Sequence, residues 1–131
     1  MTMREAVVFI LVRDGSFLVE RRKENKKLDP GMLSIPGGHI EDGEDAETAL
    51  RREMMEELSI APIDHEYVST KVYSSTYDIS IHFFSVTAWV GEIRANEAEE
   101  LMWIPLERRG ELALDTDLAA VDDYVGSIGR G

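Results

Sequence analysis

The feature that most constrains the fold is one amphipathic helix, predicted over Asp45–Leu58, that lies between segments typical of strands. Leu50, Met54 and Leu58 recur every four residues and form an apolar stripe along it. Glu44 and Asp45 place negative charge at its N-terminus, where the helix dipole favours it. Such a helix must bury its stripe against another element, and the rest of the chain supplies strands.

Strand-like segments stand on both sides of this helix. Ala6–Val12 is a continuous apolar run, and the turn signal Asp14-Gly15 separates it from Phe17–Val19, so we predict a β-hairpin whose first strand is buried on both faces. The order of strands, helix, strands and helix predicts an α/β fold with a mixed sheet and helices packed on its faces. The other predicted elements are a loop over Lys23–Gly31, a short strand over Leu33–Ile35, a turn at Pro36-Gly37-Gly38, strands over Tyr67–Tyr77, Ile79–Val90 and Leu101–Ile104, and a closing helix over Asp117–Ile128 with a frayed tail from Gly126 to Gly131.

Composition limits the number of domains and the classes of partner. A chain of 131 residues, 44% of them hydrophobic, fits a single domain over residues 1–131. It has no cysteine, which excludes disulfides and thiolate metal sites. No apolar run reaches the roughly 18 residues needed to cross a bilayer and no signal-peptide pattern is present, so we expect a cytoplasmic protein with no membrane partner. The net charge of −12 argues against nucleic-acid polymers as partners, because their phosphates need a basic face.

Three glutamates share one side of the predicted helix. Successive residues rotate by about 100°, so Glu53, Glu56 and Glu57 fall within a sector of about 100° beside the apolar stripe. Carboxylates crowded in this way repel one another, and a divalent cation such as Mg²⁺, which prefers hard oxygen ligands, relieves that repulsion. Helical geometry alone leaves a second interpretation open, namely a solvated acidic face on an ordinary surface helix.

The residues around these glutamates favour the cation site. Gly37 and Gly38 bring glycines next to the helix, where backbone carbonyls can approach a ligand that a Cβ would block. Arg52 precedes Glu53 and lies four residues before Glu56, so it can pair with a carboxylate and hold its orientation. The sequence therefore predicts a divalent-metal site between the glycines and the helix.

The stretch from Gly38 to Ile60 resembles the Nudix box, the signature of the Nudix hydrolase family with its MutT-like nucleotide pyrophosphohydrolases. The resemblance implies an α/β/α sandwich with a mixed sheet, in which the box forms a loop, a helix and a loop. Ser59 departs from the family pattern, which has glycine there; a non-glycine residue in a left-handed conformation costs about 1 kcal/mol, which puts the helix stop in doubt. The matched pattern is Gly38-x5-Glu44-x7-Arg52-Glu53-Met54-x-Glu56-Glu57-x-Ser59-Ile60.

The resemblance also implies which residues carry the chemistry. Glu53, Glu56 and Glu57, joined by the backbone carbonyl of Gly38, would bind Mg²⁺, with Mn²⁺ as a substitute. The metal would lower the pKa of a water molecule, neutralise phosphate oxygens and align the attack on phosphorus. Arg52 would orient Glu53, and Glu56 or Glu53 would accept the proton of the water, with Glu56 preferred.

Four further residues are candidates because of their place relative to the box. Glu44 would stabilise the box loop or reach an outer-shell water. Glu97 lies in the loop before Trp103, from which relatives often recruit another metal ligand, although a solvated loop explains it as well. Arg22 ends the second strand, where an arginine could bind a phosphate or a base, and a plain surface arginine is the alternative. Asp117 opens the closing helix, where relatives place a base-reading residue, and helix capping is the alternative.

The predicted function is metal-dependent hydrolysis of a phosphoanhydride bond in a nucleoside diphosphate linked to a further group. The first choice is a nucleoside triphosphate, oxidised or not, that yields a nucleoside monophosphate and pyrophosphate, because no long insertion favours a sugar substrate. Nucleoside diphosphate sugars and dinucleoside polyphosphates stay open as substrates. A non-catalytic nucleotide-sensing domain is the alternative of another class, although such a domain would be expected to have lost some of the glutamates. The partner is a small nucleotide, and the protein is expected to be a monomer or a homodimer.

Overall fold

The structure, a computed structural model, describes residues 4–21, 32–74 and 76–128. The elements follow the predicted order of strands, helix, strands and helix. They are β1 (Arg4–Arg13), β2 (Ser16–Arg21), β3 (Leu33–Ser34), β4 (Gly37–His39), α1 (Ala46–Leu58), β5 (Ala61–Ser74), β6 (Asp78–Val90), β7 (Glu100–Pro105), the short 3-10 helix η1 (Leu106–Glu111) and α2 (Asp115–Ile128).

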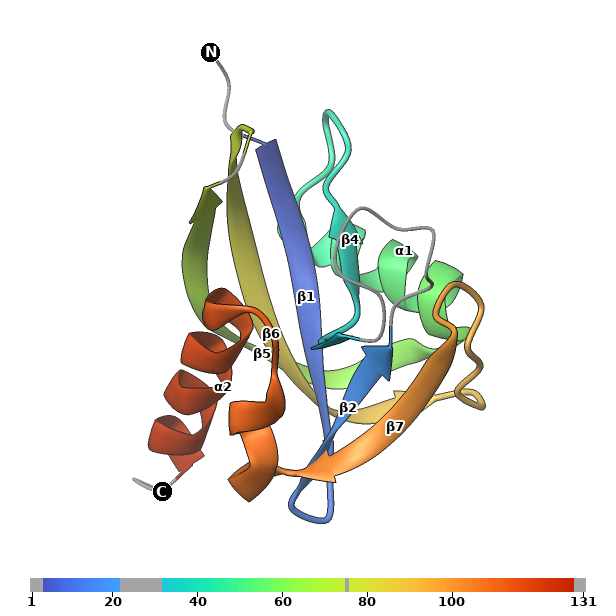
Figure 1. The fold of residues 1–131 in the computed structure, drawn as a ribbon. Coiled ribbons are helices and arrows are strands. Elements are labelled where there is room, and N and C mark those ends of the chain that lie inside the picture. The colour runs from blue at the N-terminus through green and yellow to red at the C-terminus, as the bar shows by residue number, and fades with distance from the viewer. Residues whose placement is uncertain (1–3, 22–31, 75, 129–131) are drawn as a thin grey trace.

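The strands form one mixed sheet with a helix on each side (Figure 1). Its main path runs β3-β2-β1-β6-β5, while β4 pairs with β1 and β7 pairs with β2. The β1–β6 pair is parallel and the other pairs are antiparallel. The core on one face packs against α1 and the core on the other against α2 and η1. The predicted α/β/α sandwich with a mixed sheet is confirmed.

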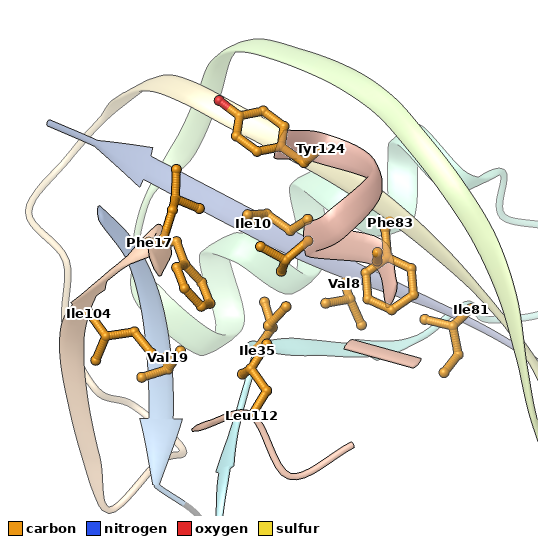
Figure 2. Close-up of a cluster of buried hydrophobic side chains, with 13 residues drawn as sticks. Val8, Ile10, Phe17, Val19, Ile35, Ile81, Phe83, Ile104, Leu112 and Tyr124 are labelled. Carbon is orange, nitrogen blue, oxygen red and sulfur yellow. The ribbon is translucent and has the colours of Figure 1, made fainter. Parts of the chain in front are cut away.

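Strand β1 lies at the centre of the sheet and supplies side chains to both cores. Val8 and Ile10 point to the α2 side, whereas Val7, Phe9 and Leu11 point to the α1 side, and all five are buried. Figure 2 shows the α2-side core around Val8 and Ile10. A strand covered on both faces needs a continuous apolar run, which explains why apolar and polar residues do not alternate in this segment. The predicted hairpin is also confirmed, because β1 pairs with β2 across Asp14-Gly15.

The helix predicted from the apolar stripe is present as α1. Leu50, Met54 and Leu58 are fully buried against the sheet. Asp45 is its N-cap, and the Asp45 carboxylate accepts a hydrogen bond of 2.8 Å from the Thr48 N–H. Capping by aspartate satisfies one of the unpaired N–H groups of the first turn and fixes where the helix begins.

The predicted turn at Pro36-Gly37-Gly38 is wrong. Gly37 and Gly38 belong to strand β4, which pairs with residues 6–8 of β1. A Cβ at Gly37 would overlap the Val7 carbonyl oxygen, and a Cβ at Gly38 would overlap the Glu53 carboxylate. The glycines are present because β4 lies too close to its neighbours for side chains, which is the usual meaning of glycine inside a strand.

Two other elements, β5 and α2, have boundaries that differ from the predicted ones, and the differences lie at their polar ends. Strand β5 begins at Ala61 and not at Tyr67, because an edge strand tolerates Pro62 and polar residues, and its register shifts near Asp64. Helix α2 begins at Asp115 and continues through Gly126 to Ile128, so the predicted fraying does not reach those residues. The predicted loop over Lys23–Gly31 lies outside the described residues. In the described part of the chain, no helix has the length and apolar character needed to cross a membrane.

Candidate active site

One cleft, with a volume of about 600 Å³, brings together most of the residues predicted from the sequence. Its size is typical of sites for small organic ligands. Its acidic lining residues come from α1, α2, β2 and the loops before α1 and β7, and most of its apolar lining residues come from the sheet. The predicted residues that line it are Gly38, Arg52, Glu53, Glu56, Glu57, Glu97 and Asp117, and the apolar lining consists of Ala6, Val8, Ile35, Tyr73, Ile79, Ile81, Ala98 and Leu114.

Arg52 connects the acidic residues on one side of this cleft. Its Nε and Nη2 donate to the two carboxylate oxygens of Glu44, each over 2.8 Å. Its Nη1 donates to Glu53 over 2.9 Å and to Glu56 over 3.1 Å. Its Nη2 also donates to the His39 carbonyl oxygen over 2.9 Å. The guanidinium therefore ties the loop before α1, strand β4 and two glutamates of α1 into one network.

The environments of Glu44 and Glu53 move their pKa values in opposite directions. The Arg52 guanidinium and the Glu41 N–H hold the pKa of Glu44 down at about 2, from an ordinary value of 4.5. Glu53 is only 8% exposed, and this burial raises the pKa of its carboxyl even though Arg52 works in the opposite direction. The hydrogen bond to Glu44 also raises the pKa of Arg52, so its positive charge is secure. Glu44 therefore stays ionised beside Arg52, whereas Glu53 is a carboxylate that further positive charge would stabilise.

Helix α1 ends at Ser59 despite the missing glycine. Ser59 is the C-cap, with φ 63° and ψ 32°, a left-handed conformation that costs a non-glycine residue about 1 kcal/mol. Its N–H donates to the Met55 carbonyl oxygen over 3.0 Å, and its hydroxyl accepts from the Asn96 side chain over 2.8 Å. The doubt about the helix stop is therefore removed, because serine adopts the backbone conformation that glycine would have supplied.

The candidate residues outside the box lie in different places. Glu97 lies in the loop before β7 and lines the cleft together with Glu56 and Glu57. Asp117 is inside the first turn of α2, and its Oδ2 accepts a hydrogen bond of 3.2 Å from the Ile35 N–H. Asp117 therefore bonds the β3–β4 connection and is not the cap of α2. Arg22 lies outside the described residues.

Ser34 and Asn96 have polar contacts or burial that the sequence did not reveal. Ser34 belongs to β3 and lines the same cleft as Asp117, which is far from it in the sequence. It is only 2% exposed, and its hydroxyl has no hydrogen-bond partner among the described residues. A buried hydroxyl normally has a partner, so Ser34 is an exception among the described residues. The signal in the sequence was a serine between the apolar residues Leu33 and Ile35. Asn96 gave no signal except that it precedes Glu97.

The cleft has the oxygen ligands that a hard divalent cation requires, although the carboxylates do not surround a single point in this structure. Glu53, Glu56, Glu57 and Glu97 supply carboxylate oxygens, and Gly38 supplies a backbone beside Glu53 that no Cβ obstructs. Within the described residues, no three acidic or histidine side chains are close enough together to hold an ion. The Glu56 carboxylate is turned toward Arg52, from which it accepts a hydrogen bond of 3.1 Å. Glu56 is about half exposed, so it can change rotamer at little cost.

The depressed pKa of Glu44 gives the Glu44→Gln variant a defined pH signature. Ionised Glu44 stabilises the folded protein fully above its unfolded-state value of 4.5, and this contribution is lost as the pH falls toward about 2. We expect the variant to be less stable than the wild type at pH 6 and the difference in unfolding free energy to shrink between pH 4.5 and pH 2.5. Urea denaturation across this range measures it. A difference that stays constant down to pH 2.5 would exclude the Arg52–Glu44 pair as its source, and Asp42→Asn, at an exposed carboxylate of the same loop, is the control.

Comparisons with known proteins find relatives over most of this chain. Residues 1–123 match the family model described as NUDIX domain. The chain is 33% identical to the CTP pyrophosphohydrolase of Escherichia coli over 123 residues, which cover 93% of this chain and 87% of that protein. It is 37% identical to the 8-oxo-dGTP diphosphatase of Haemophilus influenzae over 73 residues, 55% of this chain and 54% of that protein.

Solved structures show the same likeness in three dimensions. The solution structure of the E. coli ORF135 protein superposes with a TM-score of 0.85 at 29% identity and covers 96% of this chain and 91% of that chain. The crystal structure of a MutT NUDIX hydrolase from Burkholderia pseudomallei superposes with a TM-score of 0.83 at 25% identity, with coverage of 94% and 98%.

Proposed function

The chain belongs to the Nudix family of hydrolases, and from this premise we propose that it hydrolyses a phosphoanhydride bond in a nucleotide with the help of Mg²⁺. One observation carries the proposal. The α1 glutamates, Gly38 and Glu97 share a single cleft with an apolar lining and with Asp117. A ligand with a charged phosphate chain and a flat, apolar nucleoside matches both parts of that cleft.

The acidic residues of the cleft divide the work of binding and catalysis. We propose that Glu53, Glu56, Glu57, Glu97 and the Gly38 carbonyl hold Mg²⁺, with Mn²⁺ as a substitute. The bound metal supplies neutralisation of the phosphate charge and a lower pKa for an attacking water. Glu56 is exposed enough to reach that water and accept its proton.

Two residues outside the metal set support this arrangement. Arg52 orients Glu53 through the hydrogen bond of 2.9 Å, so that the carboxylate is held in place before a metal arrives. Glu44 neutralises Arg52 with two hydrogen bonds and keeps the guanidinium in position. The phosphate chain also needs positive charge from the protein, and Arg22 is our candidate for that contact.

We propose a nucleoside triphosphate as the substrate, cleaved to a nucleoside monophosphate and pyrophosphate. The base would lie on the apolar lining, with the Asp117 carboxylate as an acceptor at the buried side. The relatives named CTP pyrophosphohydrolase and 8-oxo-dGTP diphosphatase support this substrate class.

A panel of nucleotides tests the proposed reaction. The purified protein is incubated with Mg²⁺ and ordinary or oxidised nucleoside triphosphates, nucleoside diphosphate sugars or dinucleoside polyphosphates, and the products are separated by chromatography. Release of pyrophosphate and a nucleoside monophosphate, abolished by EDTA, is the expected result. Cleavage of sugar or dinucleoside compounds alone would replace the triphosphate assignment, and tight binding without turnover of any compound would favour a sensing domain.

Asp117→Asn is expected to change base preference without unfolding the protein. The asparagine oxygen can still accept from the Ile35 N–H, but the second carboxylate oxygen becomes an N–H₂ donor. We expect kcat/KM for the preferred triphosphate to fall about 10- to 100-fold, the value of one hydrogen bond to a charged group, while the Mg²⁺ half-saturation stays constant. Asp115→Asn, at an exposed position of the same helix turn, is the matched control. An equal loss on every base would show that Asp117 does not contact the base.

A further inference from the structure

The C-terminal end of α1 is completed by a loop that is distant in the sequence. The last carbonyl groups of a helix have no partner within the helix and must find one elsewhere. In α1, the Leu58 carbonyl accepts from the Arg94 N–H over 2.9 Å and the Glu57 carbonyl accepts from the Asn96 N–H over 3.2 Å. The loop between β6 and β7 therefore docks directly onto the end of the helix that carries Glu56 and Glu57.

The side chain of Asn96 adds two further hydrogen bonds at the same place. Its Nδ2 donates to the Glu56 carbonyl oxygen over 3.0 Å and to the Ser59 hydroxyl over 2.8 Å. An asparagine amide has two N–H donors, and both are used here. Asn96 thus contacts the backbone of two successive glutamates of α1 and the residue that ends the helix.

These contacts fix the residue that follows. Glu97 is bonded covalently to Asn96, and two residues further on the Glu99 N–H donates to the Arg21 carbonyl oxygen over 3.2 Å. The backbone of Glu97 is therefore held on one side by the end of α1 and on the other by the end of β2. Its side chain lines the same cleft as Glu53, Glu56 and Glu57.

We propose that Asn96 is a positioning residue that sets Glu97 against the α1 glutamates for metal binding, and that Ser59 is its partner. The proposal rests on the proposed function, in which Glu97 is a metal ligand. Ser59 has a specific part in it, because a glycine at this position would accept the left-handed backbone more easily but would leave one Asn96 N–H without its present acceptor.

The test measures binding of Mn²⁺ alone by isothermal titration calorimetry, so that no nucleotide or turnover is needed. Wild type, Asn96→Ala, Glu97→Gln and the double variant form a cycle. We expect each single variant to weaken Mn²⁺ binding by about tenfold, in the range measured for residues that orient ligands. The double variant should bind Mn²⁺ no more weakly than Glu97→Gln, because Asn96 acts through Glu97. Glu92→Gln removes one charge from the same loop and is the matched control, with affinity unchanged.

Ser59→Gly gives an independent readout. It removes the hydroxyl acceptor and relieves backbone strain, so we expect weaker Mn²⁺ binding together with a melting temperature that is no lower than that of the wild type. A purely structural role would move both quantities in the same direction.

The outcomes separate this inference from the proposed function. Additive losses in the Asn96→Ala and Glu97→Gln cycle, or an unchanged affinity in Asn96→Ala, would overturn the positioning role. Unchanged affinity in Glu97→Gln would also overturn it, since Glu97 would then not bind metal. If Glu53→Gln leaves Mn²⁺ binding unchanged as well, the metal site itself is wrong, whereas a loss confined to Glu53→Gln keeps the proposed reaction and removes only Glu97 from the metal ligands.

Discussion

Glu53→Gln is expected to remove hydrolysis almost completely while leaving the protein at least as stable as the wild type. Glutamine keeps an oxygen that can accept from Arg52, so the network around the guanidinium persists. It cannot supply the negative charge that a metal ligand or a general base needs. We expect the rate to fall on the order of 10²- to 10⁴-fold, as for the loss of a general base or a metal ligand.

The stability of this variant follows from the raised pKa of Glu53. Because burial disfavours the ionised carboxylate, the wild type loses stability relative to the variant as the pH rises through the folded-state pKa. In the presence of EDTA, the melting temperature of Glu53→Gln minus that of the wild type should therefore increase between pH 4 and pH 7.5. Adding Mg²⁺ should raise the melting temperature of the wild type and not that of the variant.

Two controls make the result specific to Glu53. Glu56→Gln should lose activity with little change in stability, because its side chain is about half exposed. Glu47→Gln, on an exposed part of the same helix and outside the cleft, should leave the rate unchanged. A stability loss in Glu53→Gln that matches its loss of activity would show that the carboxylate is structural, and the proposed metal role would then have to be abandoned.

Periodic features of the sequence predicted the fold well. The stripe of Leu50, Met54 and Leu58 identified α1 because helical burial repeats on a fixed spacing. The continuous run of β1 identified a strand covered on both faces, since neither face needed polar residues. The box spacing identified the glutamates that line the cleft, because they lie on one helix and their relative placement depends on local geometry alone.

Features that depend on long-range contacts were not predictable from the sequence. A glycine pair is equally compatible with a turn and with a strand pressed against its neighbours, so Gly37 and Gly38 were assigned wrongly. The contacts of Asn96 join residues 40 positions apart in the chain, and no local pattern encodes them. Asp117 is predicted to read a base, with helix capping as the alternative, and neither interpretation anticipates its hydrogen bond from the Ile35 N–H, 82 residues away.

The same glycine pair gives the second large effect, because the two positions differ in what an added methyl group would meet. At Gly38 a Cβ would overlap the carboxylate of Glu53, which is the far end of a flexible side chain. We expect Gly38→Ala to displace that carboxylate, with a loss of activity of about 100-fold and a stability cost near the lower end of the 1–3 kcal/mol typical of overpacking. Steady-state kinetics and urea denaturation measure the two quantities.

At Gly37 a Cβ would overlap the backbone oxygen of Val7, which cannot move away without breaking the β1–β4 pairing. Gly37→Ala should therefore destabilise the fold by about 3 kcal/mol or more, whereas Gly126→Ala, where a Cβ meets nothing within 4 Å in α2, should be neutral or stabilising. The informative comparison is activity per folded molecule. If Gly38→Ala keeps full activity, the position of Glu53 does not matter for catalysis. If Gly38→Ala is as unstable as Gly37→Ala, Gly38 serves strand packing alone. A folded Gly38→Ala protein with little activity would instead mean that this glycine keeps space for a carboxylate whose position the reaction requires.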